Sequence, residues 1–133
     1  MSKAEFGART TRNLFRVKRV YEPPTAIDGM RVLVDRLWPR GIGKEQARVH
    51  TWIKEIAPSA GLRVWFDHRS DRWPEFRKRY TAELRANHVN VAKLNSLAAI
   101  GPVTLLYAAR DEVHNHAVVL LAYIRRRVPR QQL

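Results

Sequence analysis

Residues 31–41 read Arg31-Val32-Leu33-Val34-Asp35-Arg36-Leu37-Trp38-Pro39-Arg40-Gly41, an apolar run that breaks abruptly into charged residues and a turn. The β-branched and aliphatic residues of this run show no helical period, so they predict a buried strand. The proline and glycine that follow end the strand. Asp35, Arg36 and Arg40 therefore lie at or just past the carboxyl end of a strand, which is the edge of an open α/β sheet where ligands collect.

The remaining apolar patterns predict two further strands and several helices. Rough alternation over Leu14–Tyr21 indicates a half-buried strand, and the run Val103–Ala109 is apolar on both faces, which is typical of a central strand. Helical spacing of apolar residues predicts helices over residues 49–56, 59–66, 73–85, 91–98 and 117–124, and it places Trp52 in the core. The expected fold is a single compact α/β domain with a small central sheet of about three strands and four to five helices packed on it. The pairing of the first two strands is left open.

Length and composition are those of one globular domain. The chain has 133 residues, 45% of them hydrophobic and 28% charged, and no apolar run approaches the ~20 residues of a membrane span. Residues 1–13 are expected to form a flexible extension and residues 128–133 a flexible tail. Because the chain has no cysteine, disulfides, thiolate nucleophiles and cysteine-based metal sites are excluded. This composition fits a cytoplasmic protein without a membrane partner.

The chain is strongly basic. Twenty-five Lys and Arg against twelve Asp and Glu give a formal net charge of +13. Such an excess attracts polyanions, so a nucleic-acid-associated protein that binds through distributed Lys and Arg charge is the alternative function. The aromatic residues of the basic helix over 73–85 fall on its single apolar stripe, which favours core packing over base stacking.

Two polar groups follow apolar strands and are the candidate binding site. Asp35, Arg36, Trp38 and Arg40 follow the second strand, and Arg110, Asp111, His114, Asn115 and His116 follow the last one. If these strands are parallel neighbours, both groups meet at one edge and form a pocket for a small anionic ligand, such as a phosphate or a carboxylate. The competing interpretation is structural: Asp35 and an arginine form an internal ion pair that locks the loop, while Trp38 and Pro39 plug the core.

A metal site or a catalytic histidine is a further hypothesis. His116 could join His68 and Asp35 in a His/carboxylate site for zinc or iron, which needs no cysteine. Alternatively, His116 could act as a general acid or base oriented by a carboxylate. The sequence contains no nucleophile elbow, no Gly-rich phosphate loop and no His-Glu-x-x-His, so catalytic residues are not assigned.

Several short motifs together resemble one known family, and the resemblance spans about Val17 to Arg127. The chain is similar to the YeaO-like family of small bacterial proteins, which is a domain of unknown function. The resemblance implies a compact bacterial α/β domain and supplies no activity. It rests on Asp28-Gly29, the stretch 31–41, Trp52 with residues 54–59, Trp65-Phe66 with His68, Phe76 with Tyr80, Leu105-Leu106-Tyr107, and Asn115-His116-Ala117.

Overall fold

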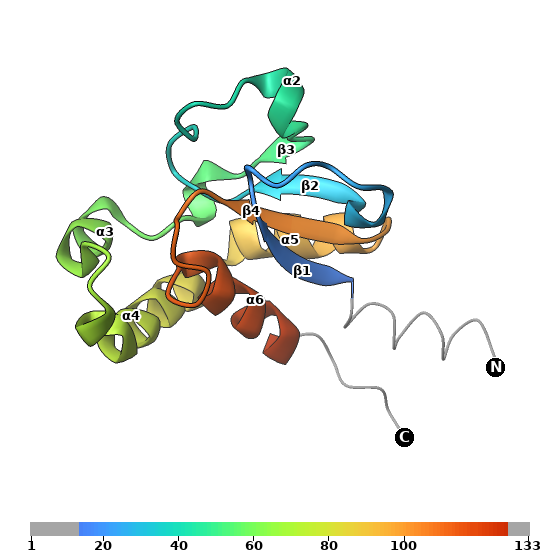
Figure 1. Ribbon diagram of the computed structural model, residues 1–133. Coiled ribbons are helices and arrows are strands. Elements are labelled where there is room, and N and C mark those ends of the chain that lie inside the picture. The colour runs from blue at the N-terminus through green and yellow to red at the C-terminus, as the bar shows by residue number, and fades with distance from the viewer. Residues whose placement is uncertain (1–13, 128–133) are drawn as a thin grey trace.

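The structure is a computed structural model that describes residues 14–127. Within that range four strands form one sheet in the order β1-β4-β2-β3, and all neighbouring pairs are parallel (Figure 1). The strands are β1 (Phe15–Arg19), β2 (Met30–Leu33), β3 (Thr51–Trp52) and β4 (Val103–Tyr107). The segments expected to be flexible, 1–13 and 128–133, lie outside the described residues.

Strand β4 is the centre of the sheet. Its five residues are all buried, and it pairs with β1 on one side and β2 on the other. A strand that is apolar on both faces must be covered on both faces, so the prediction of a central strand is confirmed. The first two strands do not pair with each other, because β4 lies between them.

The described residues contain five α-helices and three short 3-10 turns. The helices are α2 (Lys44–Ala47), α3 (Ala60–Phe66), α4 (Trp73–Ala86), α5 (His88–Ala98) and α6 (His116–Arg127), and the turns are η1 (Ala26–Asp28), η2 (Lys54–Ile56) and η3 (Ser70–Arg72). No helix between residues 14 and 127 has the length and apolar character needed to cross a membrane. The architecture is therefore a single α/β domain, as predicted.

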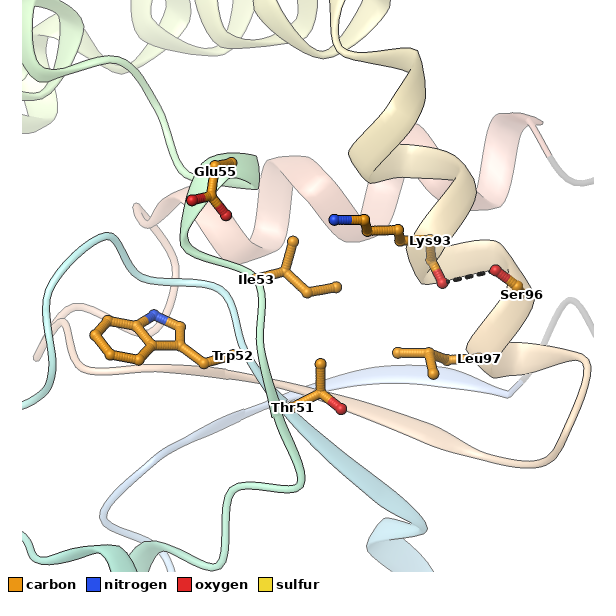
Figure 2. Close-up of a pocket in the computed structure, with 7 residues that line it drawn as sticks. All are labelled: Thr51, Trp52, Ile53, Glu55, Lys93, Ser96 and Leu97. Carbon is orange, nitrogen blue, oxygen red and sulfur yellow. Dashed lines mark hydrogen bonds between the residues drawn. The ribbon is translucent and has the colours of Figure 1, made fainter.

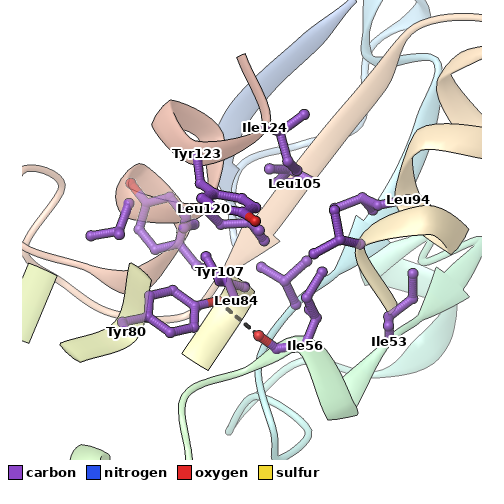
Figure 3. Close-up of a cluster of buried hydrophobic side chains, with 14 of the residues drawn as sticks. Ile53, Ile56, Tyr80, Leu84, Leu94, Leu105, Tyr107, Leu120, Tyr123 and Ile124 are labelled. Carbon is purple, nitrogen blue, oxygen red and sulfur yellow. Dashed lines mark hydrogen bonds between the residues drawn. The ribbon is translucent and has the colours of Figure 1, made fainter. Parts of the chain in front are cut away.

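Two hydrophobic clusters cover the two faces of the sheet. The larger one joins β4 to helices α3–α6, and Figure 3 shows Leu105 packed among side chains from several of these helices. On the opposite face, Leu106 packs with Leu33 and with Ala47 of α2 in a smaller cluster. Neighbouring side chains of a strand point to opposite faces, so one apolar strand supplies both clusters.

The helix predicted over residues 49–56 is wrong. Residues 51–52 form β3, which pairs with β2, and residues 54–56 form η2. The apolar residues at helical spacing serve two different surfaces: Ile53 and Ile56 enter the larger cluster, whereas Val49 packs against the smaller one. Trp52 is 37% exposed, so its predicted place in the core is also wrong. Pairing with a distant strand outweighs the local period.

Helices α3 to α6 follow the sequence pattern, whereas α2 was not predicted. Helix α3 begins after Ser59, whose hydroxyl accepts a hydrogen bond from the Leu62 amide (3.2 Å), as its position before the helix predicts. Helix α4 buries Phe76, Tyr80 and Leu84, which lie on one stripe at helical spacing. Helix α4, together with the Ser59 cap of α3, carries several of the side chains that line the candidate site.

A buried ion network lies at the start of β2. The Asp28 carboxylate, 3% exposed, lies 2.7 Å from Nη1 of Arg31 and 2.9 Å from Nζ of Lys18. It also accepts hydrogen bonds from the backbone amide and the hydroxyl of Thr25. Burial raises the pKa of Asp28, but hydrogen bonds from Lys18, Thr25 and Arg31 outweigh burial and hold this pKa well below its ordinary value.

The glycine after Asp28 allows β2 to approach the connection into β4. Gly29 has a φ of 64°, and a Cβ at this position would lie 2.3 Å from the Pro102 carbonyl oxygen. The next amide, that of Met30, donates to the same carbonyl at 2.8 Å. The Asp28-Gly29 turn therefore fixes where the pairing of β2 with β4 begins.

We expect the Asp28→Asn substitution to lower the free energy of unfolding by roughly 3 kcal/mol or more near pH 7, because the buried Arg31 and the partly buried Lys18 lose their counter-charge. The pKa of Asp28 is lower in the folded state than the ordinary value of about 3.9. Its stabilising contribution is thus present above about pH 4 and is lost as the pH falls through the folded pKa. Urea denaturation of both proteins across this range measures the difference, which should narrow below about pH 4.

The matched control is Asp71→Asn, because the side chain of Asp71 is 66% exposed and pairs only with the exposed Arg69. This variant should unfold close to the wild-type midpoint. Equal urea midpoints for the Asp28 and Asp71 variants at neutral pH would contradict a stabilising role for the buried network.

Candidate functional site

The carboxyl ends of β2 and β4 meet at one edge of the sheet. Asp35 follows β2, and His116 is the first residue of α6, which follows β4 along the chain. The His116 Nε2 atom lies 3.1 Å from Asp35 Oδ1, and each of the two side chains is 16% exposed. The structure therefore brings together one residue from each of the two predicted polar groups.

The Asp35 and His116 side chains are held by the backbone around them. Asp35 Oδ2 accepts the Ala108 amide at 3.1 Å, and the Asp35 carbonyl accepts the Trp52 indole N–H at 2.7 Å. His116 Nε2 lies 3.0 Å from the Val34 carbonyl oxygen. Because a carbonyl only accepts hydrogen bonds, this contact assigns the proton to Nε2. The sequence-based alternative named an arginine as the partner of Asp35. The structure places the His116 ring there instead, and this contact is an ion pair only when the ring is protonated.

Arg36 lines a hollow next to this pair, which we call the rim hollow. It has a volume of about 400 Å³. The polar residues that line it are Arg36, Glu55, Ser59, Tyr80, Glu83 and Asn87. The Nη2 atom of Arg36 donates to the carbonyls of Ala57 (3.2 Å) and Pro58 (3.4 Å). Its Nε atom is buried and has no hydrogen-bond partner among the described residues. Arg36 therefore lines the hollow with a guanidinium oriented by two carbonyls, and its Nε is a buried donor without a partner in the described part of the chain.

The other polar groups of the rim hollow are largely occupied. Glu83 accepts from the amide (2.8 Å) and the hydroxyl (2.5 Å) of Ser59, and Asn87 donates to the Glu55 carbonyl. The Tyr80 hydroxyl donates to the Ile56 carbonyl at 2.8 Å. Burial raises the pKa of Tyr80 well above its ordinary value, with smaller contributions from Glu83 and Asp35. Tyr80 therefore remains a protonated donor.

Three of the predicted site residues form hydrogen bonds within the turn before α6 or at the start of that helix: Asp111, His114 and Asn115. Asp111 Oδ1 accepts the amides of Val113 (2.9 Å) and His114 (2.8 Å), and Oδ2 lies 2.9 Å from His114 Nδ1. The bonds from His114, with that from Val113, lower the pKa of Asp111 to about 2. Asn115 Oδ1 accepts the Val118 amide at 3.1 Å, so Asn115 caps α6.

The remaining predicted site residues lie apart from the Asp35–His116 pair. Trp38 packs against the smaller cluster and donates to the Ile42 carbonyl, whereas Arg40 and Arg110 are exposed and have no side-chain partner within residues 14–127. His68 is exposed and its ring contacts Phe66. No three His, Asp or Glu side chains in the described part of the chain form a group that could hold a metal ion. The predicted set of His68, His116 and Asp35 is therefore not assembled.

Sequence reasoning missed most of the rim hollow. Glu83 and Asn87 lie three and seven residues after Tyr80, so helical spacing places all three along one side of α4 and its end. That spacing is the signal that could have found them. Nothing in the sequence indicated that Glu55 and Ser59 lie beside them, because this depends on the path of the chain between β3 and α3.

Comparison with known proteins gives a family and no activity. A family model described as "Inactive DUF488-N3 subclade" matches residues 14–132. The chain belongs to this family. Its YeaO-like character, predicted from the motifs, is confirmed by the uncharacterized protein YeaO of Escherichia coli (strain K12), which is 44% identical over 108 residues, or 81% of this chain and 94% of that protein.

Mycobacterial relatives of this YeaO-like chain are equally similar. An uncharacterized protein of Mycobacterium tuberculosis (strain ATCC 25618 / H37Rv) is 46% identical over 105 residues, which cover 79% of this chain and 88% of the relative. An uncharacterized protein of Mycobacterium bovis gives the same values. No solved structure matches the chain significantly.

We expect His116 to carry its proton on Nε2 in the neutral imidazole, because the Val34 carbonyl can only accept. Long-range ¹⁵N–¹H correlation spectra of the histidine rings at about pH 8, above the ordinary histidine pKa, report the tautomer directly. His88 is exposed and provides an internal reference for an unconstrained ring. A neutral His116 protonated on Nδ1 would contradict the geometry of the rim.

Proposed function

We propose that this YeaO-like chain binds a small anionic ligand in the rim hollow, through Arg36, and does not turn it over. The observation that carries this proposal is the buried Nε of Arg36, which has no hydrogen-bond partner among residues 14–127 although the side chain lines a hollow of about 400 Å³. A buried donor without a partner is costly, and an acceptor on a bound ligand would remove that cost.

A carboxylate is the anion that suits this hollow best. The guanidinium of Arg36 is planar, and its contacts with the Ala57 and Pro58 carbonyls restrict its orientation, which favours a planar partner. Glu55 and Glu83 line the same hollow and repel a multiply charged ligand. These carboxylates therefore favour a singly charged carboxylate over a phosphate.

Two observations support binding without catalysis. Asp35 and His116 contact each other and backbone groups, and the Tyr80 hydroxyl donates to the Ile56 carbonyl. These groups therefore position the chain around the rim hollow and are not free to act on a substrate. The family description, with the word "Inactive", agrees with this interpretation.

A cytoplasmic location fits a chain without cysteine, which needs no oxidising compartment.

Nucleic-acid binding through distributed charge is the second candidate, and the net charge of +13 favours it. Exposed and half-exposed arginines gather around Trp65, with the guanidinium carbons of Arg72 and Arg79 at 5.2 and 4.3 Å from its ring centroid. Binding of this kind would weaken steeply with salt, would show no sequence preference and would not depend on Arg36.

The test titrates ¹⁵N-labelled protein with sodium benzoate, a planar carboxylate, and follows backbone amide shifts. We expect shifts at Ser59 and Asn87, which line the rim hollow. Arg36→Ala should weaken the apparent affinity at least roughly tenfold, since hydrogen bonds to charged groups contribute about 1.5–3 kcal/mol. Arg36→Lys keeps the charge and loses the planar fork, so it should recover only part of the affinity.

Arg40→Ala is the matched control, because Arg40 is an exposed arginine of the same loop outside the rim hollow. This variant should bind benzoate as the wild type does. Equal weakening by the Arg36 and Arg40 substitutions would show that general charge attracts the anion, which contradicts the proposal. In parallel, duplex DNA titrated against salt tests the second candidate, and Arg36→Ala should leave its salt dependence unchanged.

A further inference from the structure

A second hollow lies on the other side of η2, between the edge strand β3 and helix α5. We call it the β3–α5 groove; its volume is about 320 Å³ (Figure 2). Thr51 and Ile53 line it from β3 and the residue after it, and Lys93 and Leu97 line it from α5. Glu55 lines both this groove and the rim hollow, but Arg36 lines only the rim hollow.

One part of the groove is apolar. Ile53 is only 4% exposed, and Leu97 is half-buried against the larger core cluster. Figure 2 shows Leu97 on α5 across from Thr51, with Ile53 between them and η2. These side chains form the apolar part of the groove lining, with Ile53 almost fully covered and Leu97 the more accessible of the two.

The other part of the groove carries two opposite charges. Figure 2 shows the Lys93 side chain extending from α5 toward the segment that carries Glu55. Neither the Lys93 ammonium nor the Glu55 carboxylate has a hydrogen bond or an ion pair within the described range, 14–127. Ser96, by contrast, is satisfied by the carbonyls of its own helix. The groove thus presents one free cation and one free anion beside an apolar surface.

We propose that the β3–α5 groove binds a free α-amino acid with an apolar side chain. The ligand's carboxylate pairs with Lys93, its ammonium pairs with Glu55, and its side chain packs against Ile53 and Leu97. A zwitterion satisfies both charges at once, whereas a simple carboxylate or a simple amine satisfies one and is repelled by the other. This chemistry differs from that of the rim hollow, where the guanidinium selects an anion.

The test uses L-leucine as the probe and ¹⁵N-labelled full chain. Leucine should shift the amides of Thr51 and Leu97 and give weak, saturable binding. The analogues 4-methylpentanoate and 3-methylbutylamine, which each keep one of the two charges, should shift these groove amides with about two- to fivefold weaker affinity. Lys93→Met and Glu55→Gln should each weaken leucine binding by a similar factor.

A control variant distinguishes leucine binding in the groove from binding elsewhere on the protein. Lys78→Met removes an exposed helical lysine on α4, outside the groove, and this variant should bind leucine as the wild type does. The inference is overturned if Lys93→Met behaves like Lys78→Met. It is also overturned if N-acetyl-leucinamide, which lacks both charges, binds as tightly as leucine.

Discussion

The contact between His116 and Asp35 holds together the edge of the sheet on which the candidate site depends. His116 Nε2 lies 3.1 Å from the Asp35 carboxylate and 3.0 Å from the Val34 carbonyl, while the other carboxylate oxygen accepts the Ala108 amide. These contacts tie the chain after β2 to the chain after β4 and to the start of α6. Arg36 is the next residue along the chain, so its direction follows from how Asp35 is held.

Both candidate binding sites lie on the face of the sheet that helices α3–α6 cover, and they share one short segment, η2. The turn η2 separates the rim hollow from the β3–α5 groove, and Glu55 lines both. Buried Ile53 and Ile56 fix the segment in the core, and the Asn87 side chain donates to the Glu55 carbonyl. The opposite face of the sheet is built differently: there the Asp28 network and the small cluster under α2 close the fold. The two proposed binding sites and the buried ion network thus lie on different faces of the sheet.

The sequence predicted what local patterns and sheet geometry determine. Val103–Tyr107 is apolar on both faces and is the central strand, and the meeting of Asp35 with His116 follows from the rule that parallel strands end at one edge. The short strand β3 was not predictable, because residues 49–56 satisfy a helical period and only pairing with the distant β2 selects a strand. In the polar group after β4, Asn115 caps α6, whereas Asp111 is engaged by the turn before that helix. The sequence therefore predicted the edge of the sheet at which Arg36 lies, but not the other residues that line the rim hollow.

A double-mutant cycle on Asp35→Ala and His116→Ala, read by urea denaturation, tests the central claim most directly. If the two side chains hold the edge of the sheet together, the losses in the free energy of unfolding are not additive, and the coupling energy is at least about 0.5 kcal/mol. Additivity within about 0.3 kcal/mol would contradict the claim, because it would mean that the two residues stabilise the fold independently.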